Sequence, residues 1–186
     1  MFQIVNRGDV NLKEGKINYL TGNVKSDEWY TPIEVVEFIK NNINLENKKI
    51  ICPFDSDKSN FVKLFPNSIH NIRDFMEKEY DYDICITNPP FSLRDKVIRR
   101  CLDYNKDVIL IFPENAIFSV TFYNLINEYN FKYKIYSPKK RIYFIDEKGN
   151  QNRPNFHSVI LYINKEFKYD EIIHFDLEDV SNSKNK

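Results

Sequence analysis

The sequence predicts an α/β fold with a mostly parallel sheet and an antiparallel edge strand, and three observations lead to this prediction. Short apolar runs alternate with segments of helical spacing from residue 27 to about residue 129, which is typical of strand–helix–strand units. Two of these runs end at prolines, which stop a strand. The last two predicted strands flank a polar turn that contains Gly149, and this pattern favours an antiparallel edge.

The first predicted helix follows a polar segment. Residues 1–26 hold three of the four glycines and show no sustained period, so we expect an irregular N-terminal arm there. Thr31 suits the N-cap of the next segment, and Pro32 suits its first helical position. The apolar residues that follow have helical spacing, and they are Val35, Val36, Phe38 and Ile39. A helix is therefore predicted from Thr31 onward.

The remaining elements are predicted in the order strand, helix, strand. The predicted strands are 49–54, 68–72, 82–87, 107–113, 133–136, 141–145 and 157–164. Helices are predicted at 61–65 and at 92–102, where Ser92 can serve as the cap, and one more helix ends near residue 129. A short helical turn is predicted at 74–79. The interval between Asp55 and Asn88 leaves little room for a helix between the second and third strands. We therefore expect a sheet that is abbreviated between its first and fourth strands.

Length and composition are those of one globular domain. The 186 residues are 42% hydrophobic and 29% charged, and no apolar run approaches the roughly 20 residues that span a bilayer. The N-terminus has no signal-peptide pattern, so we expect a cytoplasmic protein that does not enter the membrane. The expected division is an arm at 1–26, one domain at 27–178 and a polar tail at 179–186.

Cysteine spacing and net charge restrict the candidate functions. The three cysteines and three histidines are scattered along the chain, without the spacing of metal ligands, so no metal is expected. The formal net charge is zero, whereas most proteins that hold duplex DNA unaided carry a basic surplus. A DNA partner would therefore require a local basic face.

The segment Thr87-Asn88-Pro89-Pro90-Phe91 is the sharpest chemical feature of the sequence. It follows a predicted strand, at the edge where doubly wound sheets bind their ligands. The two prolines stiffen the loop, so the Asn88 amide and the Pro89 carbonyl can accept hydrogen bonds from both protons of a planar amine and concentrate its lone pair. Phe91 can stack on a flipped base. The alternative is a turn that merely ends a strand.

This loop resembles the catalytic motif of amino-methyltransferases, in which Asp or Asn is followed by two prolines and an aromatic residue. More specifically, the chain resembles small phage- and prophage-associated adenine-specific (N6) DNA methyltransferases, which depend on S-adenosylmethionine. The matching segments are Asp27-Glu28-Trp29-Tyr30-Thr31-Pro32, Cys52-Pro53-Phe54-Asp55, Asn88-Pro89-Pro90-Phe91 and, more weakly, residues 138–162. The resemblance implies a Rossmann-like methyltransferase sheet, S-adenosylmethionine as cofactor, and N6-adenine methylation of DNA.

The resemblance also implies a set of cofactor-binding residues. It assigns Tyr30, Thr31 and Pro32 to the methionine end of the cofactor, together with the strand end at Pro53, Phe54 and Asp55. Asp74 and Phe75 fall where the family contacts the cofactor adenine. Each assignment has a structural alternative, since Thr31 and Asp74 also suit helix caps and the acidic turn after Phe54 also suits an exposed loop.

Two features depart from the family pattern. The loop after Phe54 contains no glycine, although such loops usually need glycine for close approach to the cofactor. The second strand ends in His70 and Asn71 instead of the acidic residue that binds the cofactor ribose. Both departures concern cofactor affinity.

Two basic stretches compete for contact with a nucleic acid. Lys139, Lys140 and Arg141 precede a predicted strand and have tyrosines nearby, which suits an extruded base and its backbone. A second group lies on the helix after the catalytic loop, and it consists of Arg94, Lys96, Arg99 and Arg100. Charge on a helix face usually serves solvation alone. No segment is large enough for a separate recognition domain, so specificity would come from loops, the arm, a second subunit or a partner.

The sequence therefore predicts adenine methylation, with three alternatives. The same loop also serves enzymes that methylate guanine N2 in RNA or a glutamine amide in protein. A non-catalytic binding or inhibitor module with a methyltransferase fold is the third alternative, and the glycine-free loop permits it.

Overall fold

The computed structural model describes residues 30–177, except residues 73, 91, 147 and 153. Its helices are α2 (Ile33–Asn42), α3 (Asn60–Leu64), α4 (Arg94–Asp103), α5 (Glu114–Ile117) and α6 (Val120–Tyr129). Its strands are β1 (Ile50–Cys52), β2 (Ile69–His70), β3 (Ile84–Thr87), β4 (Asp107–Pro113), β5 (Lys132–Pro138), β6 (Phe144–Ile145), β7 (Gln151–Asn152), β8 (Ser158–Asn164) and β9 (Glu171–Phe175). The predicted arm at 1–26 and the tail at 179–186 lie outside the described residues.

Within the described residues, one seven-stranded sheet has the order β2-β1-β3-β4-β8-β5-β9. Strands β2, β1, β3 and β4 run parallel, β8 runs antiparallel to both of its neighbours, and β9 is parallel to β5. The predicted class, a mostly parallel Rossmann-like sheet, is confirmed. The antiparallel strand, however, lies inside the sheet between β4 and β5, and the edges are β2 and β9.

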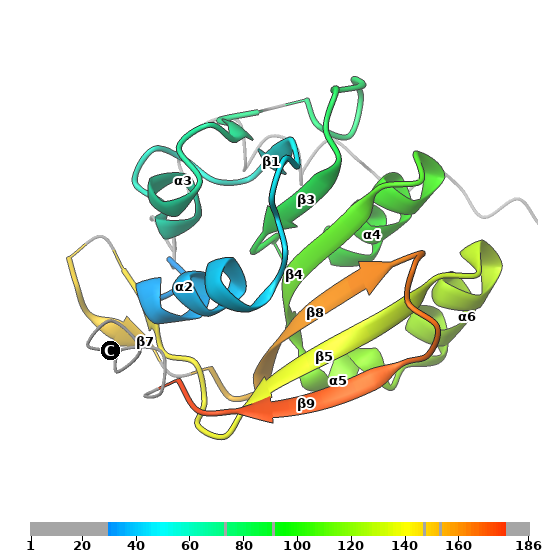
Figure 1. Cartoon of the computed structure of the whole chain (residues 1–186). Coiled ribbons are helices and arrows are strands. Elements are labelled where there is room, and N and C mark those ends of the chain that lie inside the picture. Colours follow the sequence, from blue (N-terminus) through cyan, green and yellow to red (C-terminus); the bar gives the residue numbers. More distant parts are fainter. Residues whose placement is uncertain (1–29, 73, 91, 147, 153, 178–186) are drawn as a thin grey trace, which may run out of the picture.

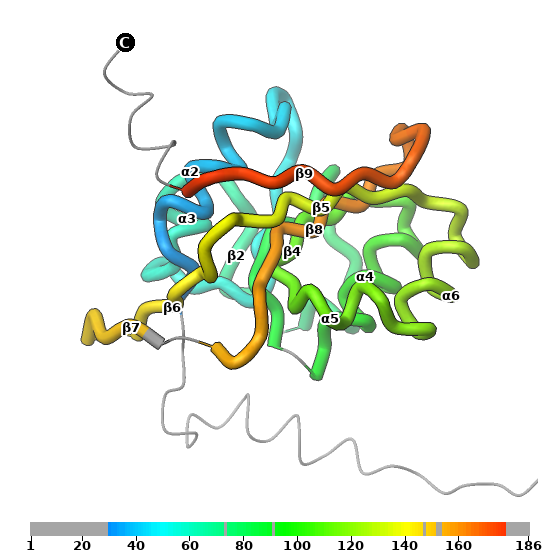
Figure 2. Tube along the Cα trace, turned by 90° about the horizontal axis from the view of Figure 1, so that it is seen from below, coloured from blue at the N-terminus to red at the C-terminus, as the bar shows by residue number. Residues whose placement is uncertain are grey.

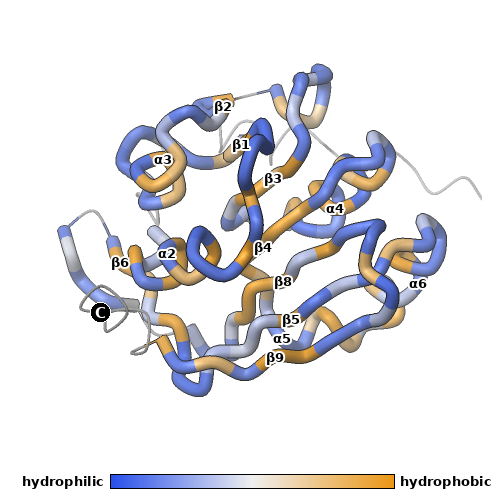
Figure 3. The backbone as a smooth tube through the Cα atoms, viewed as in Figure 1, coloured by the Kyte–Doolittle hydropathy of each residue, from blue (hydrophilic) through white to orange (hydrophobic). Residues whose placement is uncertain are grey.

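Helices cover both faces of this sheet (Figures 1 and 2). Helices α2 and α3 lie on one face, and α4, α5 and α6 lie on the other. Each face has its own cluster of buried apolar side chains, and strands β3 and β8 are buried along their whole length. Figure 3 shows the hydrophobic character of the central strands β3 and β4. Burial on both faces explains why these strands are continuous apolar runs in the sequence.

Two predicted helix starts differ from the structure. Pro32, and not Thr31, is the N-cap of α2, and no side chain caps this helix. Helix α4 begins at Arg94 after Leu93 as N-cap, later than the predicted Ser92 cap places it. Residues 74–79 form turns, which agrees with the short helical turn predicted there. Between β1 and β3 the described residues provide only α3, the two-residue strand β2 and these turns, so the predicted abbreviation of the fold is confirmed.

The C-terminal third contains two further differences. Strand β9 was not predicted, and it pairs with β5 from Lys134–Glu171 to Pro138–Phe175. The segment predicted as a strand at 141–145 contributes only β6, which forms a separate two-stranded sheet with β7. Among the described residues, no helix is long and apolar enough to cross a bilayer.

Candidate active site

The carboxyl ends of the parallel strands bring the predicted catalytic and cofactor loops together. Asp55 follows β1, and Asn88 follows β3. These strands are direct neighbours, with Ile51 opposite Cys85, so the two loops leave the sheet about 5 Å apart. A hollow of about 460 Å³ lies elsewhere, where Lys49, Phe65 and Asp81 contribute to its lining. It contains none of the predicted site residues.

The Asp55 carboxylate joins the two loops. Thr87 Oγ1 donates a hydrogen bond to Asp55 Oδ2 (2.7 Å), and Ser59 Oγ donates to Asp55 Oδ1 (2.6 Å). Burial raises the pKa of Asp55 to about 6, although both hydroxyl donors and the charge of His70 act in the opposite direction. Desolvation therefore outweighs the two hydrogen bonds.

The segment from Tyr30 to Pro32 lies beside the same loop. Asn60, the first residue of α3, donates from Nδ2 to the Thr31 carbonyl (2.9 Å). Tyr30 and Ile145 exchange two backbone hydrogen bonds, of 2.7 and 3.0 Å, so the β6–β7 hairpin holds this segment from the other side. Thr31 is 3% exposed, and its Oγ1 has no hydrogen-bond partner in the described part of the chain. An orphaned buried hydroxyl is a feature that a bound ligand would satisfy.

An acidic group does reach the end of β2, although it comes from another loop. His70 Nε2 lies 3.0 Å from Asp57 Oδ1, and Asn71 Nδ2 donates to the same oxygen at 3.3 Å. The Asn71 backbone N–H donates to the Asp55 carbonyl (3.0 Å), which fixes the two loops to each other. The Asp57 side chain is 80% exposed. Although the second strand itself lacks the acidic residue of the family pattern, a carboxylate from the β1 loop lies at its end.

The predicted catalytic loop keeps its polar atoms available. Pro89 is buried and Asn88 is half-buried, while the Pro90 carbonyl accepts from Leu93 N (2.8 Å) and starts the turn into α4. Neither the Asn88 side chain nor the Pro89 carbonyl forms a hydrogen bond with another described residue. Phe91 lies outside the described residues.

The residues predicted for the cofactor adenine are engaged within the chain. Asp74 is paired with Lys78 (2.7 Å) and accepts a hydrogen bond from Tyr80. The Lys78 contact, followed by the Tyr80 hydrogen bond, lowers the pKa of Asp74. Phe75 is 2% exposed, and its ring meets Phe54 edge-on at 6.0 Å between centroids. Pro53, in the same strand end as Phe54, is also buried.

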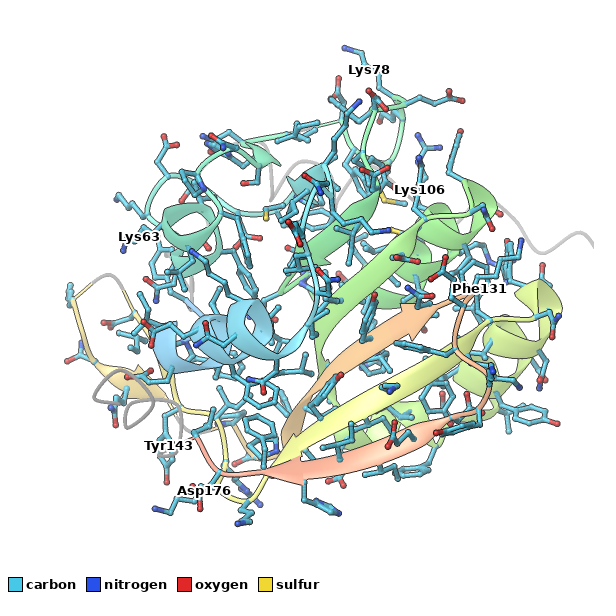
Figure 4. The ribbon with its side chains drawn as sticks, viewed as in Figure 1. Lys63, Lys78, Lys106, Phe131, Tyr143 and Asp176 are labelled. Carbon is cyan, nitrogen blue, oxygen red and sulfur yellow. The ribbon has the colours of Figure 1, made fainter. Side chains whose placement is uncertain are left out.

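The predicted substrate residues Lys139, Lys140 and Arg141 follow β5. Lys139 N donates to the Phe175 carbonyl (2.9 Å), and its Nζ lies 3.8 Å from Asp176. Arg141 Nη1 donates to the Pro154 carbonyl (3.3 Å). Three strand spacings separate β5 from β3, which corresponds to about 14 Å. Figure 4 shows Asp176 far from Lys78 across the molecule, so Lys139, which lies beside Asp176, is far from the Asp74–Lys78 pair.

The arginines of α4 are largely occupied by intramolecular contacts. Arg99 forms two hydrogen bonds to Glu128 (2.8 and 3.0 Å), and Arg100 donates to the Lys78 carbonyl (2.7 Å). Arg94 lies over the Phe112 ring at 5.5 Å. These contacts favour a structural role for this face of the helix.

The three cysteine thiols are buried among apolar residues of the described region. Cys52, Cys85 and Cys101 are buried, and burial raises the pKa of Cys52 and Cys85 well above the usual range. A buried thiol that stays protonated is a poor nucleophile. No group of three or more metal-ligating side chains is found among the residues that the structure describes.

The sequence analysis did not assign four polar residues to this site, and they are Asp57, Ser59, Asn60 and Thr87. Ser59 carried a detectable signal, because a serine just before an apolar run suits an N-cap, and it does cap α3 by accepting from Phe61 N. Thr87 was recognised only as part of the motif. Its contact to Asp55 spans 32 residues, so local pattern gives no indication of it.

Comparison with known proteins identifies the fold class. Neither a family model nor a curated protein matches the sequence. A protein from Listeria monocytogenes, assigned as a class I S-adenosylmethionine-dependent methyltransferase, aligns at a TM-score of 0.51 with 10% identity, over 89% of this chain and 71% of the other. At that identity the likeness concerns the fold alone. The chain has the Rossmann-like fold of class I methyltransferases.

Two further solved structures are less similar. One, assigned as an RNA methyltransferase from Pyrococcus horikoshii, has 16% identity and a TM-score of 0.46 over 72% of this chain and 82% of the other. Another, assigned as a modification subunit of a type I restriction enzyme from Vibrio vulnificus, has 13% identity and a TM-score of 0.48 over 82% of this chain and 48% of the other.

Proposed function

We propose that this chain is an S-adenosylmethionine-dependent methyltransferase that acts on the N6 amine of adenine in DNA. One observation carries the proposal. The Asn88 side chain and the Pro89 carbonyl follow a buried strand, make no hydrogen bond to other described residues, and adjoin the loop after β1. Unpaired acceptors on a proline-stiffened loop at this edge suit a ligand with two amine protons.

The polar groups around the β1 loop fit such a cofactor. The Asp55 carboxylate suits the methionine ammonium of the cofactor. The orphaned Thr31 hydroxyl can donate to the methionine carboxylate. Asp57, held at the end of β2 by His70 and Asn71, suits the vicinal hydroxyls of a ribose. When bound, S-adenosylmethionine supplies an electrophilic methyl group.

The other proposed cofactor contacts are those that the resemblance to adenine-specific DNA methyltransferases implies. Tyr30 and Pro32 flank Thr31 in the segment that Asn60 and Ile145 hold in place. Pro53 and Phe54 shape the strand end, while Asp74 and Phe75 are proposed to lie toward the cofactor adenine. Asp74 would then exchange part of its pairing with Lys78 and Tyr80 for the ligand.

The chain's contribution to chemistry is orientation of the acceptor amine. An exocyclic amine is a weak nucleophile because its lone pair is delocalised into the ring. Hydrogen bonds from its two protons to Asn88 Oδ1 and the Pro89 carbonyl favour a pyramidal nitrogen with its lone pair toward the methyl donor. Pro90 fixes the loop, and Phe91 is proposed to stack on the flipped base.

DNA is the proposed partner on the strength of a local basic stretch. Lys139, Lys140 and Arg141 follow β5 on the same edge of the sheet as Asn88, about 14 Å away. At that distance from Asn88, the three cations can contact phosphates on either side of an extruded nucleotide, and not the target base itself.

The test uses S-adenosylmethionine that carries a labelled methyl group, with DNA, RNA and protein supplied as separate acceptors. After each reaction the product is digested to nucleosides or amino acids and separated. Label in N6-methyldeoxyadenosine is the expected result. Label in N2-methylguanosine or in methylglutamine would overturn the adenine assignment and identify the acceptor directly.

A non-catalytic module with the same fold is the alternative of a different class. The glycine-free loop from Phe54 to Ser59 is the observation that favours it. Such a module would bind nucleic acid or a partner without a thermal shift on addition of S-adenosylmethionine, and no acceptor would gain label.

A further inference from the structure

The hydroxyl of Thr87 is the strongest polar feature that the proposed function leaves unexplained. Thr87 is fully buried at the end of β3, after Ile84, Cys85 and Ile86, which are equally buried. A hydroxyl inside such a strand is costly unless it is hydrogen-bonded, and a valine would fill the same space. The hydroxyl is satisfied by Asp55 Oδ2 at 2.7 Å.

The Asp55 carboxylate is held from two sides that belong to different parts of the site. Ser59 Oγ binds Oδ1 at 2.6 Å and belongs to the β1 loop itself, as the N-cap of α3. Thr87 binds Oδ2 and directly precedes Asn88 in the chain. The side-chain contact between Thr87 and Asp55 therefore links the proposed cofactor loop to the proposed catalytic residue.

We propose that Thr87 is a positioning residue, whose hydrogen bond to Asp55 sets the separation between the cofactor loop and Asn88. The inference rests on the proposed function and adds to it a residue that touches neither substrate nor cofactor. Methyl transfer depends on the distance and angle between the donor and the acceptor amine, and a misplacement of about 1 Å can cost about 100-fold in rate. Ser59, in contrast, orders Asp55 within its own loop.

Three variants separate positioning from simple stability. Thr87→Val keeps the shape of the side chain and removes the hydroxyl, Thr87→Ser keeps the hydroxyl, and Ser59→Ala removes the other donor to the same carboxylate. We expect Thr87→Val to lower the transfer rate at saturating cofactor by roughly 10- to 100-fold with less than about a threefold change in cofactor Kd. Thr87→Ser should recover most of the rate, whereas Ser59→Ala should act mainly on cofactor affinity.

A second readout does not depend on activity. Thr87 and Ser59 both lower the pKa of Asp55, and so does the charge of His70. Titration of the Asp55 carboxyl carbon by NMR should therefore give a higher pKa in Thr87→Val than in wild type, and an unchanged one in Thr87→Ser. If Thr87→Val does not fold, Thr87→Ala takes its place in both measurements.

The outcomes separate the inference from the proposed function. An Asp55 pKa that does not move in Thr87→Val would overturn the inference whether or not the protein transfers methyl groups. A wild-type rate in Thr87→Val, or a rate in Thr87→Ser as low as in Thr87→Val, would also overturn it. A wild-type protein without transferase activity, with the pKa shifted as expected, would overturn the proposed function and the positioning role together while leaving the Thr87–Asp55 bond established.

Discussion

Asp55 is under opposing demands, since the carboxylate is desolvated and yet is proposed to hold a cationic ammonium. Burial raises its pKa to about 6, so folding favours its protonated form. Between about pH 4 and pH 6, Asp55 is therefore protonated to a greater extent in the folded state than in the unfolded chain. In that window the contribution of Asp55 to stability falls as the pH rises, the reverse of a salt-bridged carboxylate.

Replacing Asp55 with Asn should expose this contribution. Asn is neutral at every pH and keeps one acceptor oxygen. We compare the free energy of unfolding of wild type with that of Asp55→Asn at two pH values. The difference should favour wild type more at about pH 4.5 than at about pH 7.5, by at most about 2 kcal/mol. Urea unfolding of both proteins at the two pH values measures the difference. A pH-independent difference would show that the carboxyl group is not desolvated.

Asn88 is expected to matter for transfer and not for cofactor affinity. Because its side chain is proposed to contact only the acceptor amine, Asn88→Ala should lower the transfer rate at least about 100-fold. Cofactor Kd, measured by calorimetry, should change little. Asn88→Asp is the matched control, since it keeps an acceptor oxygen and should retain more activity. Equal losses of rate and cofactor affinity in Asn88→Ala would contradict the assigned role.

At the level of elements, β9 ties the end of the described chain to the first helix. Phe175 stacks on Phe38 of α2, with ring centroids 3.8 Å apart, and both side chains are largely buried. Ile172, on the same strand, is 54% exposed. These contacts cross the fold from β9 to the helix that begins at the Thr31–Pro32 segment.

Phe175→Ala should therefore destabilise the protein by about 3 kcal/mol, because it empties a buried aromatic position. Ile172→Ala on the same strand should cost less than about 0.5 kcal/mol. Chemical denaturation of the two variants and wild type gives the comparison. Similar values for both variants would mean that β9 does not pack as described.

The strands that are most clearly predictable from the sequence are those whose burial is continuous. β4 and β8 are apolar along nearly their whole length, so composition alone reveals them. β9 alternates between partly buried and exposed residues before the buried Phe175 and includes Glu171 and His174, which hides it among polar loops. The segment 141–145 has strand-like composition, but only two of its residues pair, in the β6–β7 hairpin.

The candidate site was predictable to the extent that its residues lie in local motifs. Asn88 and Asp55 follow strands, and parallel topology alone brings them to one edge. The contacts that join them were not predictable, because Thr87–Asp55 and His70–Asp57 link residues 32 and 13 positions apart. Side-chain hydrogen bonds over such separations depend on the finished fold.

For the molecule as a whole, charge is arranged in internal pairs more than in one basic face. The formal net charge is zero, and Arg99 and Arg100 contact other parts of the chain. Proteins that bind nucleic acid without a basic surplus depend on a few local cations. Binding to DNA should therefore be weak and strongly dependent on the basic loop after β5.

Neutralising the basic loop after β5 should weaken DNA binding. Replacing Lys139 and Lys140 with Gln should weaken binding to a labelled duplex, and the slope of log Kd against log salt should fall by roughly one for each phosphate that the loop neutralises. Replacing Lys63 and Lys168, which are exposed and lie outside both basic stretches, with Gln removes the same charge elsewhere and serves as the control. Equal effects of the two double variants would argue against the β5 loop as the DNA contact.

A calorimetric titration of the full chain with S-adenosylmethionine and S-adenosylhomocysteine, with Asp55→Ala beside wild type, tests directly whether the chain has a cofactor site at Asp55. If Asp55 holds the cofactor, S-adenosylmethionine should bind wild type with a Kd of about 1 μM, or roughly −8 kcal/mol, and Asp55→Ala should abolish this binding. Absence of binding to wild type, or binding that Asp55→Ala leaves unchanged, would contradict a cofactor site at the carboxyl ends of β1 and β3.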